Sequence, residues 1–242
     1  FRECGINDSY APGYGIRLDS GDLAYLSQEV RRVLDEHGMK ACKIFATNGL
    51  DEYLITDLER QGARIDSYGV GDAIATSKDA PCFGNVYKLV QIDDEPVLKR
   101  SEDLVKLINP GFQITWRISC GGRSEADVTC LRGDALDVAI REGRDITLRD
   151  EHDSYKSKSF RAGSYSARAL QHEGIKDGKR VAAPHTLQEK KDFYRANLDS
   201  LSPAERRLIN PHFHKVDISD DLYSLKMRII GKLVREIEAF DI

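Results

Sequence analysis

An arginine and two aspartates stand close together near the start of the chain, in the stretch YGIRLDSGDLAYLS (14–27). Arg17 and Asp19 are two residues apart, so a strand that continued through Asp19 would place both side chains on one side. Arginine binds carboxylates and phosphates through paired hydrogen bonds, while aspartate accepts hydrogen bonds from sugar hydroxyls or binds a metal ion. The alternative is a mutual ion pair, and the spacing leaves both interpretations open. Asp22 directly precedes a helical pattern, and we expect it to be the helix N-cap.

Two further turns follow strand-like runs and could hold an anion. The first is ATNGLDE (46–52), where Asn48 and Gly49 tolerate the left-handed backbone of a tight turn. The helix expected after it would direct free N–H groups toward a phosphate, although Asn48 could instead be a simple N-cap. The second is YGVGD (68–72), whose Gly69 and Gly71 would let the backbone approach an anion closely. Such a pair of glycines is weak evidence alone, and three turns on successive strands carry more weight.

The elements that would position these turns alternate along the first part of the chain. Apolar periodicity predicts three strands, two helices after the first two strands, and a turn after the third; the strands are 13–18, 41–47 and 63–70, the helices 22–38 and 48–62, and the turn 71–77. This alternation is typical of parallel βα units in an α/β fold. In such units ligands bind at the carboxyl ends of the strands, where all three turns would lie.

The rest of the chain has a different pattern. Residues 82–100, 111–120 and 126–134 read as strands of an antiparallel β segment, whereas 141–185 are polar with little periodicity. One or two helices are expected within 186–209, and Ser219 could cap a final amphipathic helix. We therefore predict three segments: parallel βα units at 1–82, which the resemblance given below implies are a partial α/β barrel, a β-rich segment at 83–140, and a mixed loop and helical region with C-terminal helices at 141–242.

Composition narrows the class of protein. Among 242 residues, 40% are hydrophobic and 31% are charged, with a net charge of -4. Nucleic-acid and membrane-surface binders usually carry clustered excess lysine and arginine, so neither partner is expected. No apolar run approaches the roughly 18 residues that a membrane-spanning helix needs. The five cysteines form no CxxC pair, and reduced thiols in a cytoplasmic protein are the simplest interpretation.

Several motifs, taken in order, resemble the nicotinate phosphoribosyltransferase family. They are YGIRLDSGDLAYLS, ATNGLDEYLI, IDSYGVGDAIATS, FGNVYKLV and KRSEDLVKLINPGF, with a looser similarity in NPHFHKVDIS (210–219). The resemblance implies an irregular type II phosphoribosyltransferase α/β barrel and the joining of nicotinate to the ribose of phosphoribosyl pyrophosphate. It also implies coupled ATP hydrolysis through a phosphorylated histidine, Mg²⁺ bound with the phosphates, and an active site shared across a homodimer.

The resemblance also implies roles for residues that match the motifs. Arg17 would contact the nicotinate carboxylate, and Asp19 would lie beside the ribose hydroxyls and the magnesium-bound pyrophosphate. The sugar and its 5′-phosphate would be lined by Thr47, Asn48 and Gly49, and the phosphate-binding turn would comprise Gly69, Gly71 and position 72. Asp72 departs from the threonine that many members carry, and because a carboxylate would repel phosphate, we expect only its backbone N–H to be used.

A second departure concerns the beginning of the chain. The sequence starts just before the RLDSGD motif, so the family's first half, with its nicotinate-stacking aromatic residue and phosphorylated histidine, is expected upstream. None of the six histidines here matches the context of that histidine. We therefore expect the C-terminal half of the enzyme, which needs the N-terminal half for turnover. Non-catalytic remnants, partner subunits and sugar-phosphate-binding modules remain alternatives.

Overall fold

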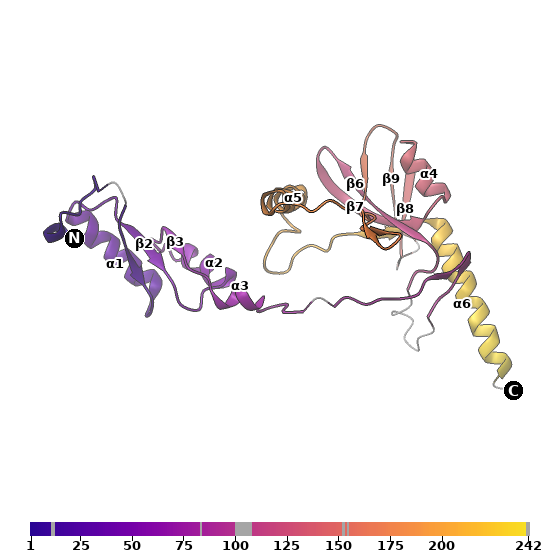
Figure 1. The fold of residues 1–242 in the computed structure, drawn as a ribbon, viewed down its shortest axis with the longest axis horizontal. Coiled ribbons are helices and arrows are strands. Elements are labelled where there is room, and N and C mark those ends of the chain that lie inside the picture. Colours follow the sequence, from indigo (N-terminus) through magenta and orange to yellow (C-terminus); the bar gives the residue numbers. More distant parts are fainter. Residues whose placement is uncertain (11–12, 83, 100–107, 152, 154, 241–242) are drawn as a thin grey trace. The chain divides into compact units, whose positions relative to one another are not determined.

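The computed structural model describes residues 1–242 except 11–12, 83, 100–107, 152, 154 and 241–242 (Figure 1). The chain forms two compact units, Phe1–Asn85 and Val86–Ile242. The first unit contains a short 3-10 helix, three strands and three helices, with the bounds η1 Arg2–Cys4, β1 Gly15–Leu18, α1 Leu23–Glu36, β2 Lys43–Ala46, α2 Glu52–Arg60, β3 Ser67–Tyr68 and α3 Asp72–Thr76.

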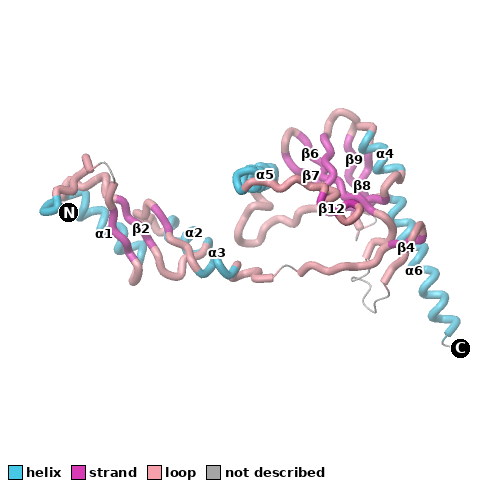
Figure 2. Tube along the Cα trace, in the orientation of Figure 1, coloured by secondary structure: helices cyan, strands magenta, loops and turns pink. Residues whose placement is uncertain are grey.

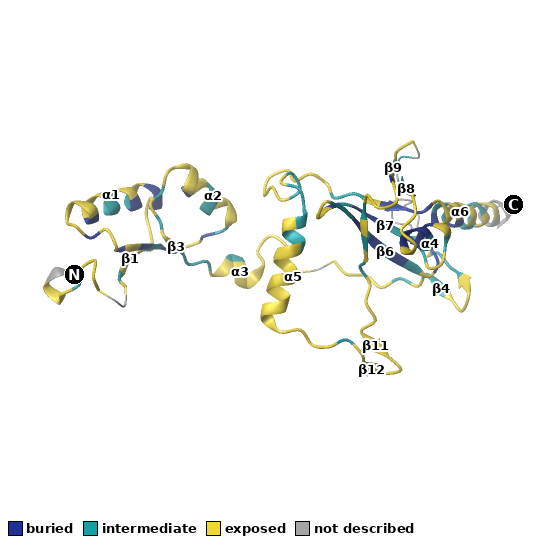
Figure 3. Ribbon diagram, turned by 90° about the horizontal axis from the view of Figure 1, so that it is seen from above, coloured by how far each residue is buried: buried dark blue, intermediate teal, exposed yellow. Residues whose placement is uncertain are grey.

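The strands of the first unit form a parallel sheet in the order β1-β2-β3. Its register places Arg17 opposite Phe45, and Phe45 opposite Ser67. Helices α1 and α2 cover one face, as Figure 3 shows, because their apolar sides pack on Ile44, Ala46 and the other inward-facing strand residues. The predicted βα alternation is therefore confirmed. The predicted turn at 71–77 is wrong, since Asp72–Thr76 form the short helix α3 after the N-cap Gly71.

Capping fixes where the two longer helices begin. The Asp22 side chain accepts a hydrogen bond from the Tyr25 backbone N–H and caps α1, as predicted. The cap of α2 is Asp51, whose carboxylate accepts from the Leu54 N–H at 2.8 Å, so Asn48 is not the N-cap. Because neither cap uses Arg17 or Asp19, those side chains stay available for chemistry at the end of β1.

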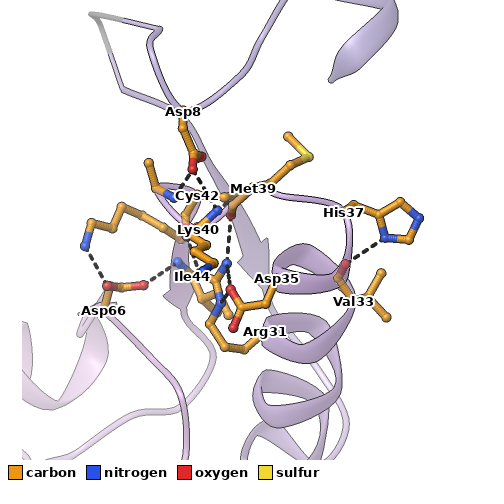
Figure 4. A network of polar contacts seen from close by, with 12 residues as sticks. Asp8, Arg31, Val33, Asp35, His37, Met39, Lys40, Cys42, Ile44 and Asp66 are labelled. Atoms are coloured by element: carbon orange, nitrogen blue, oxygen red, sulfur yellow. Dashed lines mark hydrogen bonds and ion pairs between the residues drawn. The ribbon is translucent and has the colours of Figure 1, made fainter.

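A polar network anchors the opposite end of the first sheet (Figure 4). Asp8 accepts hydrogen bonds from the Tyr14 hydroxyl at 2.7 Å and from the Lys40 and Ala41 backbone N–H groups. The hydrogen bond from Tyr14 is the largest influence that lowers the pKa of Asp8, while burial and then Asp8 raise the pKa of Tyr14 to about 12. The residues before β1 are thereby tied to the loop that enters β2.

Arg31 of α1 secures the same loop from the helix side (Figure 4). Its guanidinium donates to the backbone carbonyls of Cys42 at 2.7 Å and Met39 at 2.8 Å, and it pairs with Asp35. These contacts fix where β2 begins. They consequently fix which β2 residue lies beside the end of β1.

The described residues of the second unit form a six-stranded sheet, two hairpins of short strands, and three helices. Their bounds are β4 Gln91–Ile92, β5 Glu95–Pro96, β6 Gln113–Cys120, β7 Arg123–Leu131, α4 Ala135–Arg141, β8 Ile146–Asp150, β9 Ser157–Phe160, β10 Ser166–Ala169, β11 Ile175–Lys176, β12 Lys179–Arg180, α5 Leu187–Ser200, β13 Val216–Ile218 and α6 Asp220–Phe240. The sheet order is β10-β6-β7-β13-β8-β9, antiparallel except for the parallel pair β7 and β13. The predicted segments 83–140 and 141–242 both contribute strands to this sheet.

The core of this unit lies between the sheet and α4. Inward-facing residues alternate along β6 and β7, and the buried set is Ile114, Trp116, Ile118, Ala126, Val128, Cys130, Leu136, Ala139, Ile140, Ile146, Leu148 and Phe160. The predicted strands 111–120 and 126–134 are confirmed in β6 and β7, although β7 begins earlier. Ser219 caps α6 by accepting from the Leu222 backbone N–H, also as predicted.

Two predictions for the second unit are wrong. The stretch predicted as a strand at 82–100 contains only the two-residue strands β4 and β5, and Figure 2 shows loop before them; residues 83 and 100 lie outside the described residues. The turn between β4 and β5 contains Asp93 at φ 50°, which interrupts the extended backbone. The polar region 141–185 contains β8 to β12 rather than irregular structure. Strands β10 and β8 pair with the distant strands β6 and β13, whereas β9 pairs with β8 and β11 with β12 in local hairpins of short strands.

Candidate functional site

Three of the predicted site residues meet at the carboxyl ends of β1 and β2. The Thr47 backbone N–H donates to the Leu18 carbonyl at 2.9 Å, which extends the strand pairing by one residue. Arg17 Nη2 lies 2.7 Å from Asp19 Oδ1, and Arg17 Nε donates to the Thr47 hydroxyl at 2.9 Å. The same hydroxyl donates to Asp19 Oδ1. A cation, an anion and a hydroxyl thus form one closed cluster.

The cluster is exposed and charged. The side chains of Arg17 and Asp19 are 59% and 53% exposed, so a dissolved ligand can reach both. The hydrogen bond from Thr47, and then the one from Arg17, lower the pKa of Asp19 below its ordinary value. Asp19 is therefore an anion near neutral pH and suits electrostatic stabilisation or metal contact rather than proton abstraction.

The third turn contacts this cluster through Gly69. The Gly69 backbone N–H donates to the Ala46 carbonyl at 2.8 Å, which brings the turn against the end of β2. A Cβ added at position 69 would lie 2.8 Å from Thr47 Cγ2 and 2.9 Å from Phe45 Cζ. No side chain fits there without displacing Thr47 or Phe45. Glycine is required here by close approach rather than by an unusual φ angle.

The other predicted residues lie on flanking turns. Asn48 and Gly49 have φ angles of 86° and 60°, so the predicted left-handed turn after β2 is confirmed. Gly71 faces open space, and Asp72 is exposed in the first turn of α3. Within the described part of the chain, no hydrogen bond or ion pair joins these four residues to Arg17, Asp19 or Thr47.

Phe45 is part of the site although the sequence analysis did not select it. It lies directly opposite Arg17 in the sheet. Its ring atom Cζ lies 2.9 Å from the place that a Cβ at position 69 would occupy. The alternation of exposed and buried residues in β2 could have indicated it, because Phe45 and Thr47 lie two residues apart and share one face.

Across the residues that the structure describes, no group of three or more histidines, cysteines or carboxylates is placed to hold a metal ion. Among the residues that the structure describes, no helix is long and apolar enough to cross a membrane.

Comparisons with known proteins show what this chain is similar to. Residues 113–226 match the nicotinate phosphoribosyltransferase C-terminal domain. The nicotinate phosphoribosyltransferase of Bacillus subtilis is 34% identical over 230 residues, which are 93% of this chain and 46% of that protein. The chain is therefore similar to nicotinate phosphoribosyltransferases over most of its own length. Nicotinate phosphoribosyltransferase 2 of Arabidopsis thaliana is 32% identical over 228 residues, covering 90% of this chain and 40% of that protein.

Solved structures agree on the fold. The crystal structure of human nicotinic acid phosphoribosyltransferase has a TM-score of 0.65 at 22% identity, covering 90% of this chain and 40% of that one. A nicotinate-nucleotide pyrophosphorylase from Pyrococcus furiosus has a TM-score of 0.55 at 21% identity, covering 77% and 40%. The chain thus has an α/β fold of this kind. It spans less than half the length of the curated relatives that it matches.

Proposed function

We propose that the chain is the C-terminal part of a nicotinate phosphoribosyltransferase acting in NAD biosynthesis. The reaction joins nicotinate to phosphoribosyl pyrophosphate with hydrolysis of ATP, and it gives nicotinate mononucleotide, pyrophosphate, ADP and phosphate. The observation that carries the proposal is the Arg17–Asp19–Thr47 cluster, because it places a guanidinium beside an ionised carboxylate at the carboxyl ends of adjacent parallel strands. Similarity to nicotinate phosphoribosyltransferases supports the assignment of substrates.

Arg17 would recognise the acid group of nicotinate. Its Nε and Nη2 atoms are engaged by Thr47 and Asp19, and among the described residues no partner is recorded for Nη1. A carboxylate ligand can accept a charge-assisted hydrogen bond from that remaining nitrogen. The amide of nicotinamide carries no charge, so Arg17 would favour the acid over the amide.

The flanking turns would hold the phosphates. The left-handed backbone at Asn48 and Gly49 and the first turn of α3 both present backbone N–H groups without helical partners. Asp72 would take part through its backbone N–H, since its carboxylate would repel a phosphate. Gly69 and Gly71 would let the ligand approach the backbone closely.

The proposed chemistry needs positioning and charge stabilisation more than covalent help. Displacement of pyrophosphate builds positive character on the ribose, and Asp19 would stabilise that charge and orient the ribose hydroxyls. The nicotinate ring nitrogen is already a nucleophile, so no general base is required. When Mg²⁺ is bound, it neutralises the departing pyrophosphate, and Asp19 is the residue of this cluster that could contact it. Holding both substrates in line can lower the barrier by up to about 7–11 kcal/mol.

Other parts of the proposal reach beyond this chain. The first unit would form part of an irregular type II phosphoribosyltransferase barrel that the N-terminal half completes. The enzyme would be a cytoplasmic homodimer, and its phosphorylated histidine would lie in the N-terminal half, so no step of ATP hydrolysis is assigned to residues here. The chain alone is expected not to turn over. Formation of nicotinate mononucleotide from radiolabelled nicotinate by this chain alone would contradict that expectation.

Nuclear magnetic resonance titration with phosphoribosyl pyrophosphate and Mg²⁺ tests the proposal directly. We expect chemical-shift changes at the amides of Thr47, Gly49 and Gly69, and weaker binding in Asp19→Asn. Changes confined to the second unit would contradict the proposed site. Binding of phosphoribosyl pyrophosphate without any binding of nicotinate would instead favour a simple sugar-phosphate-binding module.

A further inference from the structure

We infer that Thr47 is a positioning residue that holds Arg17 and Asp19 in one fixed arrangement, and that the missing side chain at Gly69 leaves the space that the Thr47 methyl group occupies. The inference rests on the proposed function for the identity of the ligand, an aromatic carboxylate, but the positioning itself can be measured without any ligand. It differs from the role implied by the family resemblance, in which Thr47 simply lines the sugar site.

The hydroxyl of Thr47 links Arg17 to Asp19. It accepts from Arg17 Nε at 2.9 Å and donates to Asp19 Oδ1, the same oxygen that Arg17 Nη2 approaches at 2.7 Å. An exposed pair of long side chains is otherwise held weakly, because ordering two flexible side chains costs entropy. A hydroxyl carried by a β-branched residue at the end of a strand adds a stiff third point to the pair.

The methyl group of Thr47 lies beside Gly69, where no side chain competes for its space. A Cβ at Gly69 would lie 2.8 Å from Thr47 Cγ2, so the methyl group occupies the space that a side chain at 69 would need. The Phe45 ring fills the adjoining space, at 2.9 Å from the same Cβ position. The methyl and the hydroxyl share one carbon atom, so holding the methyl in place also aims the hydroxyl. A side chain at position 69 would therefore disturb Arg17 and Asp19 by displacing Thr47.

The consequence is a site that is ordered before ligand arrives. With two of its nitrogens fixed, the guanidinium plane of Arg17 is set, and the carboxylate of Asp19 is held beside it. A carboxylate ligand then loses less freedom in binding, because the protein groups need no reordering. Selectivity for an acid over its amide should consequently depend on Thr47 as well as on Arg17.

The test compares side-chain signals in the ligand-free chain. The pKa of Asp19 is measured from its carboxyl carbon resonance, and the protection of the Arg17 Nε–H is measured from its proton–nitrogen signal. Thr47→Val removes the hydroxyl and should raise the pKa of Asp19 and abolish the protection. Thr47→Ser keeps the hydroxyl and should retain most of the lowered pKa. Thr56→Val is the matched control, since the Thr56 hydroxyl donates only within α2, to the Glu52 carbonyl.

A second comparison tests the role of Gly69. Gly69→Ala should displace the Thr47 methyl group and resemble Thr47→Val, whereas Gly69→Ala combined with Thr47→Ser should recover part of the lowered pKa of Asp19. If Thr47→Val leaves both signals at their wild-type values, the positioning role is refuted. If Gly69→Ala leaves them unchanged, Gly69 does not control the Thr47 side chain.

Titration with nicotinate separates this inference from the proposed function. Thr47→Val should weaken nicotinate binding roughly tenfold relative to Thr56→Val, with a smaller change for nicotinamide. Equal losses for the two ligands would overturn the link to acid selectivity. Absence of nicotinate binding even when the chain is combined with its N-terminal half would count against the proposed function, while the ligand-free signals of the chain alone would still decide whether Thr47 positions the pair.

Discussion

Acid should weaken the second unit through one identifiable carboxylate, Glu205. Glu205 Oε2 accepts from the Ser202 backbone N–H at 2.8 Å, and Glu205 Oε1 lies 2.6 Å from His214 Nδ1. The other ring nitrogen of His214 lies 3.5 Å from Asp127, which pairs through both oxygens with Arg117. Hydrogen bonding with Ser202 first, and with His214 second, lowers the pKa of Glu205 from 4.5 to about 2.

The contribution of Glu205 to stability follows from the difference between its ordinary pKa and its pKa in the folded chain. The Glu205 side chain is only 11% exposed, so solvent screens its contacts with Ser202 and His214 little. Because the pKa of Glu205 is lower in the folded state, the ionised carboxylate stabilises the fold. This contribution is fully present above pH 4.5 and is lost as the pH falls from 4.5 toward 2. Since a tenfold change in proton affinity corresponds to about 1.4 kcal/mol, Glu205 contributes about 3 kcal/mol to the free energy of unfolding at pH 7 and about 1 kcal/mol at pH 3.

Urea unfolding followed by tryptophan fluorescence measures this contribution. Trp116 is the single tryptophan of the chain and lies in the core of the second unit, so its signal reports that unit. Glu205→Gln should lower the urea midpoint by about 1 M at pH 7 and by clearly less at pH 3. Glu142→Gln is the control, because Glu142 is 57% exposed and should change stability by less than about 0.5 kcal/mol. A loss in Glu205→Gln that stays the same at both pH values would refute the reasoning.

Two further substitutions test the packing of the sheets. Gly15→Ala places a Cβ 2.6 Å from the Lys43 backbone carbonyl oxygen. It should destabilise the first unit by about 1–3 kcal/mol and speed hydrogen exchange at the β2 amides. Unchanged exchange would contradict this contact. Asp137 is 2% exposed and accepts from Trp116 Nε1 at 2.9 Å and from the Gly133 N–H at 2.8 Å. Asp137→Ala should therefore lower the stability of the second unit by roughly 3–5 kcal/mol in the same urea assay, whereas a loss below about 1 kcal/mol would show that the buried hydrogen bonds matter little.

The first unit could be predicted from the sequence because its signals are local. Apolar periodicity marked its strands and two longer helices, and the Asp22 cap marked where the first helix begins. Gly38 and Gly62 follow those helices with φ angles of 71° and 75°, as expected of helix ends. The same pattern brought Arg17, Asp19 and Thr47 to one end of a parallel sheet. Their individual contacts depend on the register between β1 and β2, which no local pattern specifies.

The second unit was harder to predict because long-range pairing forms its sheet. Strand β13 spans only Val216–Ile218 and pairs with β7 about 90 residues earlier, so nothing in its own sequence indicates its central position. The contact of Gly69 with Thr47 escaped prediction for a related reason. It depends on two segments whose spacing in the folded chain is set by β2 and β3, and the sequence indicated close approach of Gly69 to an anion rather than to Thr47.

Binding of nicotinate and nicotinamide to the unaltered chain and to Arg17→Ala tests the central claim most directly. If Arg17 recognises the acid group, Arg17→Ala should weaken nicotinate binding by roughly 1.5–3 kcal/mol, measured by calorimetry or by the amide shifts of Thr47. Nicotinamide binding should change much less, because it has no charge for the guanidinium to recognise. Equal weakening of both ligands, or no weakening of nicotinate, would show that Arg17 does not read the carboxylate and that the proposed site is wrong.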